Sequence, residues 1–180
     1  MIPETKDWTW ALQRPCPECG LDTRSFARED IPAIIGANAA GWQQALTASA
    51  DPAARPTPGK WSPVEYACHV RDLLVLCDYR LGLMLTQDDP LFANWDQDEA
   101  AVTGRYGKQV PTEVATQIRD AAGTAASRFA KVAGDQWLLK GRRSDGVRFT
   151  VETFGRNLVH EAVHHLYDVT AVRHGGPHRS

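Results

Sequence analysis

Apolar residues recur at helical three- and four-residue spacing along four long segments, and this pattern constrains the fold more than any other feature. The predicted helices cover residues 28–49, 62–86, 111–133 and 150–173. The second starts at Ser62-Pro63 with Glu65 at the third helical position, a combination typical of a capped helix N-terminus. Four helices of this length are expected to pack as an all-α four-helix bundle.

The segments between the helices suggest how the chain is organised. Residues 1–27 are predicted to be a short irregular extension that carries the motif CPECG, residues 28–174 the bundle, and residues 175–180 a tail. Residues 87–110 are polar and form a long connection between the second and third helices, of the kind that often carries a site. The stretch GRRSDGVRF predicts a tight turn between two short extended pieces.

Charge and composition argue against several classes of partner. The net charge is -2 and the basic residues are scattered, so neither a nucleic-acid partner nor an anionic membrane is expected. No apolar stretch approaches the ~20 residues that span a bilayer. The start, MIPETKDWTW, lacks the apolar core of a signal peptide, so a cytoplasmic location is expected. In that compartment four cysteines do not predict a disulfide framework.

The last predicted helix contains NLVHEAVHHLYDV, with three histidines and two acids within nine residues. Side chains four residues apart share one face of a helix, so either His160 and His164 or Glu161 and His165 are placed to chelate one ion. The first pair spells HExxH, in which zinc peptidases use the glutamate as general base. Nothing downstream extends that peptidase signature.

Helical phase separates the two pairs. At about 100° per residue, four apolar side chains of this helix lie within about 40° of the direction of His165. Glu161 lies about 40° from His165 on the other side. These apolar residues are Phe154, Leu158, Val169 and Val172. His160 and His164 fall about 140° and 100° away, on the more polar face. A buried carboxylate is costly unless it is paired or bound to metal, so Glu161 and His165 are the favoured ligands and His160 and His164 the alternative.

His69 lies on the apolar stripe of the second predicted helix. The residues within about 60° of it are Tyr66, Leu73, Leu76, Leu83 and Met84. A single inward histidine is usually a hydrogen-bonded core residue. Together with Glu161 and His165, however, it makes three inward ligands on two helices, which suits a metal site with open coordination positions.

Two of these motifs resemble those of a known family. WSPVEYACHVRDLL resembles the second-helix signature of the DinB-like superfamily, and Glu161, His165 and Asp168 match the pattern E-x-x-x-H-x-x-D of its mycothiol-dependent maleylpyruvate isomerases. The superfamily also contains bacterial thiol-dependent transferases, and the resemblance spans about residues 28–174. It implies that His69, Glu161 and His165 bind a divalent ion, zinc or nickel, and that the protein forms a homodimer, as members often do.

The motif CPECG lies outside this resemblance. Cys16 and Cys19 make half of a tetrahedral zinc site, which two ligands from Cys68, Cys77, a histidine or another subunit would complete. A redox role and a purely structural role are the other two hypotheses for this pair.

Three hypotheses for function follow. The first is a metal-dependent transferase or isomerase, with mycothiol as the thiol implied by the resemblance, acting on a small electrophilic molecule. There Asp168 would orient a ligand histidine and Arg80 would hold a substrate carboxylate, under a roof formed by Trp95 and Tyr106. The second is an HExxH-type hydrolase with His160 and His164 as ligands. The third is a non-enzymatic metal-binding module of a stress response.

Overall fold

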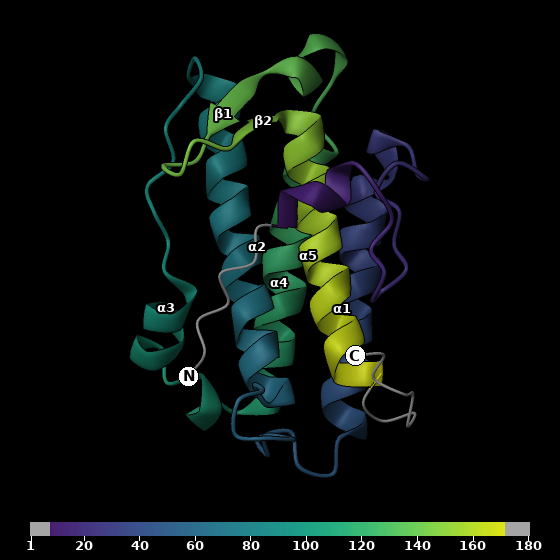
Figure 1. The fold of residues 1–180 in the computed structure, drawn as a ribbon, viewed down its shortest axis with the longest axis vertical. Coiled ribbons are helices and arrows are strands. Elements are labelled where there is room, and N and C mark those ends of the chain that lie inside the picture. Colours follow the sequence, from purple (N-terminus) through teal and green to yellow (C-terminus); the bar gives the residue numbers. More distant parts are fainter. Residues whose placement is uncertain (1–7, 172–180) are drawn as a thin grey trace.

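Four long helices lie side by side in the computed structural model, which describes residues 8–171 (Figure 1). They are α1 (Ile31–Ala48), α2 (Pro63–Thr86), α4 (Pro111–Phe129) and α5 (Val151–Ala171). The predicted all-α four-helix bundle is confirmed. The predicted tail at 175–180 and the last residues of the helix predicted over 150–173 lie outside the described residues.

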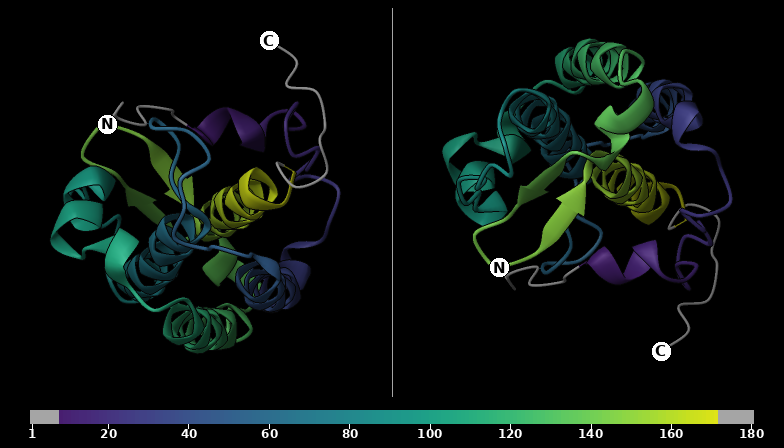
Figure 2. Two further views of the ribbon diagram at one scale, coloured as in Figure 1. Left: turned by 90° about the horizontal axis from the view of Figure 1, so that it is seen from below. Right: turned by 90° about the horizontal axis from the view of Figure 1, so that it is seen from above.

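Consecutive helices are not always neighbours in this bundle. α1 and α2 each pack against both α4 and α5 but touch each other little, so they lie diagonally opposite (Figure 2). The connection after α2 runs back along the length of the bundle, and α4 therefore points in the same direction as α2 (Figure 1). This arrangement brings α2 and α5, which carry the predicted ligands, side by side.

The start of α2 is fixed by local hydrogen bonds. The Glu65 amide donates to Ser62 Oγ at 3.4 Å, and Glu65 Oε2 accepts from the Ser62 amide at 2.8 Å. Pro63 occupies the first helical position, where no amide donor is needed. Arg55 Nε donates to the same carboxylate at 2.8 Å and fixes the preceding loop. The helix therefore begins at the position that the sequence predicts.

The long connection contains a helix that the sequence analysis did not predict. α3 (Gln97–Thr103) is capped by Asp96, whose Oδ1 accepts from the amides of Asp98 and Glu99 at 2.9 and 3.0 Å. It is seven residues long and has no fully buried side chain, so it leaves no apolar periodicity in the sequence.

A small hairpin closes one end of the bundle. β1 (Lys140–Arg142) pairs antiparallel with β2 (Arg148–Thr150), and Gly146 in the turn adopts a φ of +94°. This is the predicted turn between two short extended pieces. The Phe92 amide donates to the Arg142 carbonyl at 2.8 Å and ties the connection to the hairpin.

The N-terminal segment lies across α5 and is part of the same packed unit (Figures 1 and 2). Its described part starts with a 3-10 turn at Trp8–Leu12, and Thr23 Oγ1 donates back to the Ala11 carbonyl at 2.8 Å. Arg156 of α5 donates to the carbonyl oxygens of Thr23 and Phe26, the latter at 3.0 Å.

Among the described helices, none combines the length and apolar character needed to cross a membrane.

Candidate metal centre and its cleft

The structure brings His69, Glu161 and His165 together between α2 and α5. His69 Nε2 lies 4.0 Å from Glu161 Oε1, and the two imidazole rings are 4.8 Å apart between centroids. One ligand-type atom from each of the three side chains lies within 4.8 Å of the others. Both histidines are buried, while Glu161 is half-buried and reaches a cleft.

The histidine nitrogens lack the partners that buried polar atoms normally have. Within the described part of the chain, both ring nitrogens of His69 and Nδ1 of His165 are buried without a hydrogen bond. Burial, and then the nearby His165, lowers the pKa of His69 well below its usual 6.5, so its ring is neutral at neutral pH. Two imidazoles and one carboxylate are donors that zinc and nickel accept. The residues present therefore fit a divalent ion.

Aromatic side chains shield this cluster from water. Trp95 stacks on His69 with centroids 5.4 Å apart and an interplanar angle of 16°, and Trp61 lies 5.5 Å away. The Tyr66 ring lies 5.4 Å from His165. Electrostatic interactions are stronger in such dry surroundings than in water.

Asp168 lies one turn beyond the histidines on α5. Its Oδ2 is 3.5 Å from His165 Nδ1 and 3.7 Å from His164 Nε2, and its Oδ1 is 4.0 Å from Lys60 Nζ. Burial alone would raise the pKa of Asp168, but His165 and then His164 outweigh burial and lower it. The carboxylate is therefore charged beside two imidazoles, as the predicted orienting role requires.

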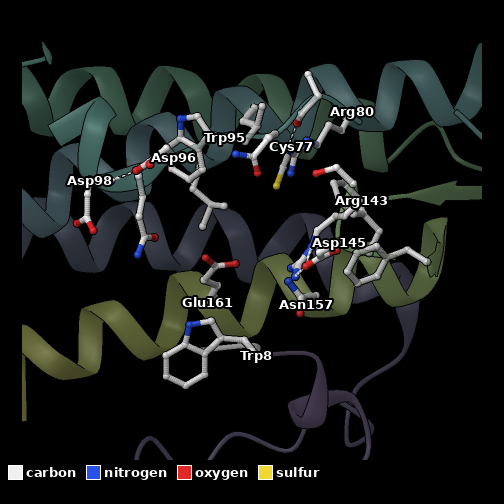
Figure 3. Close-up of a pocket in the computed structure, with 18 residues that line it drawn as sticks. Trp8, Cys77, Arg80, Trp95, Asp96, Asp98, Arg143, Asp145, Asn157 and Glu161 are labelled. Carbon is white, nitrogen blue, oxygen red and sulfur yellow. Dashed lines mark hydrogen bonds and ion pairs between the residues drawn. The ribbon is translucent and has the colours of Figure 1, made fainter. Parts of the chain in front are cut away.

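A cleft of about 370 Å³ opens beside the cluster (Figure 3). It lies between α2, the connection that contains α3, the hairpin loop and α5. Figure 3 shows the Glu161 carboxylate pointing into this space from α5, across from Cys77 and Trp95. Trp8 of the N-terminal segment lies beside Glu161 and completes that wall.

Polar groups gather at the other end of the cleft. Arg80 donates through Nη2 to the Ala93 carbonyl at 2.9 Å, and burial lowers the pKa of its guanidinium. Arg143, which forms an ion pair with Asp145, lies nearby on the hairpin loop. On α5, Asn157 Oδ1 is buried without a hydrogen-bond partner. Sequence reasoning identified Arg80 but missed the other three, because they reach the cleft only through the fold of the hairpin and α5.

The sequence predicts that His160 and His164 lie on the more polar face of the last helix, and the structure buries both of them. They are 0% and 2% exposed, and the Trp8 ring covers them at centroid distances of 5.3 and 4.4 Å. Helical phase indicates which face of α5 meets the bundle, but it says nothing of a segment that packs on the other face. Neither histidine lines the cleft; the structure groups both with Cys16 and Cys19.

Two other predictions for this region have mixed outcomes. Trp95 lines the cleft as predicted, whereas Tyr106 does not; it is buried and donates its hydroxyl to Asp72. Cys68 and Cys77 do not join Cys16 and Cys19 in a cluster of the described residues. Cys68 lies instead against the Tyr106 carbonyl, with its sulfur 3.9 Å from the oxygen.

Comparison with known proteins supports the fold. No protein-family model matches the sequence, and no curated protein matches it either. Among solved structures, it is similar to YfiT from Bacillus subtilis, described as "a probable metal-dependent hydrolase with an unusual four-helix bundle topology". The TM-score is 0.73 and the identity 15%, over 84% of this chain and 92% of the other. At that identity the likeness shows a shared fold, which agrees with the bundle that the sequence predicts.

Proposed function

We propose that the protein is an enzyme that holds one divalent ion through His69, Glu161 and His165 and acts on a small anionic electrophile. The observation that carries this proposal is the pair of buried, unpartnered His69 nitrogens beside Glu161 at the wall of a cleft. Burying such a ring without partners costs about 1–3 kcal/mol, a cost that a bound ion would remove. Zinc and nickel are the ions we propose.

The three ligands leave room for a reactant on the cleft side. Glu161 borders the cleft, whereas His69 and His165 are enclosed by aromatic rings. A divalent ion held there supplies a positive charge that lowers the pKa of a coordinated water or thiol. Asp168 Oδ2 lies 3.5 Å from His165 Nδ1 and would orient that ring, and Trp95 keeps bulk water from His69.

The cleft indicates the class of substrate. Its volume of about 370 Å³ suits a small molecule and not an extended peptide. Among the described residues, Arg80 bonds to a backbone carbonyl and to no carboxylate, so its remaining donors suit a carboxylate or phosphate of the substrate. Asn157 Oδ1, buried without a partner, suits a hydroxyl or amide donor on the same molecule.

We further propose that the reaction is a thiol-dependent transfer or isomerisation, with mycothiol as the thiol. The support is the resemblance of the two helix motifs to the thiol-dependent members of the DinB-like superfamily. A metal-dependent hydrolase is the second candidate, with water in place of the thiol. The description of YfiT, whose fold is similar, favours it. The two candidates share the ion and the cleft and differ in the nucleophile.

The test is a panel of electrophilic carboxylic acids and phosphates assayed with mycothiol, with glutathione and without thiol, beside a general peptidase assay. We expect turnover that needs mycothiol, is lost after chelation and returns on adding zinc or nickel. Turnover without any thiol would select the hydrolase. Metal-dependent proteolysis that disappears in Glu161→Gln would instead refute the small-molecule proposal.

Arg80→Met tests the anion-binding role separately. A hydrogen bond to a charged group contributes about 1.5–3 kcal/mol, so we expect the KM of anionic substrates to rise about 10- to 100-fold. Neutral analogues should be unaffected. Arg119→Met is the matched control, because Arg119 is exposed on α4, lies outside the cleft and pairs with its neighbour Asp120 at 3.3 Å. Equal effects on anionic and neutral substrates would contradict the assignment of Arg80.

A further inference from the structure

α5 also carries the histidine pair His160 and His164, which lies against the two cysteines of CPECG. One ligand-type atom from each of Cys16, Cys19, His160 and His164 lies within 4.8 Å of the others. We propose that these four side chains form a second metal site, a tetrahedral zinc centre with two thiolates and two imidazoles. This site shares no ligand with the cleft and does not rest on the proposed function.

His160 is fully buried, and within residues 8–171 neither of its ring nitrogens has a hydrogen-bond partner. The indole rings of Trp8 and Trp10 lie 5.3 and 5.8 Å from it and offer no acceptor or lone pair. A metal ion supplies the partner that a buried imidazole requires.

The two nitrogens of His164 face different groups. Nδ1 lies 3.5 Å from Cys16 Sγ, whereas Nε2 lies 3.6 Å from Glu18 Oε2 and 3.7 Å from Asp168 Oδ2. Two carboxylates favour the proton on Nε2, which leaves the lone pair of Nδ1 directed at the sulfur side. Ligand histidines in metal sites commonly have a carboxylate on the other nitrogen in this way.

The CPECG segment folds as a turn that presents both sulfurs to α5. The Gly20 amide donates to the Cys16 carbonyl at 2.9 Å, and the Cys16 amide donates to the Leu21 carbonyl at 2.9 Å. Gly20 adopts a φ of +76°, which a residue with a side chain rarely does. The spacing Cys-x-x-Cys closed by such a turn is the ligand arrangement of structural zinc sites.

The chemistry of the cluster favours zinc over a redox role. Both cysteines are free thiols in the structure, and they gather with two buried imidazoles that complete a set of four zinc donors. Binding would release one proton from each thiol, and the two thiolates would neutralise the charge of Zn²⁺. A neutral centre with all four positions filled by protein is structural and leaves no site for substrate.

The consequence is a link between the N-terminal segment and the cleft. Cys16 and Cys19 follow the 3-10 turn that carries Trp8, and Trp8 lines the cleft beside Glu161. An ion that holds the cysteines to α5 would therefore also hold this wall of the cleft in place.

Cobalt substitution of the full-length protein tests the proposal. Thiolate ligands give Co²⁺ an intense sulfur-to-metal charge-transfer band in the near ultraviolet, which nitrogen and oxygen ligands do not. We expect the band in the wild type, its loss in Cys16→Ser/Cys19→Ser, and a fall of about one bound ion per chain. The X-ray absorption of the zinc form should show sulfur at about 2.3 Å, a readout that requires no variant.

Two variants serve as controls. Cys68→Ala removes a buried cysteine outside the cluster, and His69→Ala removes a ligand proposed for the cleft; both should keep the charge-transfer band. A band that persists in Cys16→Ser/Cys19→Ser, or sulfur-free zinc in the wild type, would overturn the proposal. A Cys16–Cys19 disulfide in zinc-loaded wild-type protein would also overturn it. Loss of the cleft ion alone would refute the proposed function and leave this site intact.

Discussion

Asp168→Asn is the substitution that best tests whether α5 is built around bound ions. The carboxylate lies 3.5 Å from His165 Nδ1 and 3.7 Å from His164 Nε2, so one oxygen faces a ligand of each proposed centre. Asparagine keeps the shape and an acceptor oxygen but removes the charge. Loss of a group that orients a ligand histidine lowers metal affinity about 10- to 100-fold, or about 1.4–2.7 kcal/mol. Because the acceptor is retained, we expect the lower end of this range at both centres.

The assay is a competition titration of zinc against a chelator of known affinity, repeated with Co²⁺ so that the charge-transfer band reports the thiolate centre separately. Asp78→Asn is the matched control. Asp78 is also a partly buried carboxylate, bound to Arg128 Nε at 2.6 Å, and it is not part of either histidine cluster. It should lower stability without changing metal affinity. Equal zinc affinities in Asp168→Asn and the wild type would refute the orienting role.

Three further predictions concern stability, each measured by chemical or thermal unfolding. Gly155→Ala should lower the free energy of unfolding by about 1–2 kcal/mol, because the new Cβ would lie 2.8 Å from the buried Phe129 ring. Gly123→Ala, where the Cβ would meet open space, should raise the free energy of unfolding by up to about 1 kcal/mol. Ser62→Ala should cost about 1 kcal/mol through loss of the α2 cap. In chelated protein, His160 has a pKa of about 4, whereas the unfolded chain takes up that proton near 6.5. Stability on the order of 3 kcal/mol should therefore be present above about pH 6.5 and be lost as the pH falls toward 4; a melting temperature that does not change over this range would contradict it.

The sequence predicts the parts of the fold that depend on local physics. The N-terminus of α2 follows from Ser62, Pro63 and Glu65, which satisfy their own backbone within four residues. The hairpin turn follows from Gly146. α3 could not be predicted in this way, because it rests on one cap at Asp96 and on packing against α2. The diagonal placement of α1 and α2 is also a property of the whole bundle and leaves no mark on either helix.

Helical phase is enough to predict which residues of the site lie on the same helix face. It cannot predict which of them are covered by a segment from elsewhere in the chain. Phase places Glu161 and His165 on one face of α5 and His69 on the buried face of α2, and the structure brings the three together. The same argument assigned His160 and His164 to a polar surface. It assumed that a face turned away from the bundle is exposed, and the N-terminal segment with Trp8 covers that face.

The sequence HEAVHH therefore holds two interleaved pairs that a motif search merges into one. His160 and His164 form one i, i+4 pair, and Glu161 and His165 form another that is rotated by about 100°. In an HExxH peptidase the glutamate acts as general base beside the ion that its flanking histidines bind. Here the glutamate reaches the cleft and gathers with His69, while its flanking histidines gather with the cysteines on the covered side. Two faces of one helix thus take part in two different donor sets. One set, of nitrogen and oxygen, lies beside the cleft; the other, of nitrogen and sulfur, is completed by the N-terminal segment that covers the helix. A metal site with a free coordination position suits catalysis, and one whose four positions are filled by protein suits a structural role. The six-residue stretch HEAVHH therefore contributes two ligands to each proposed site, and the sites share none of them.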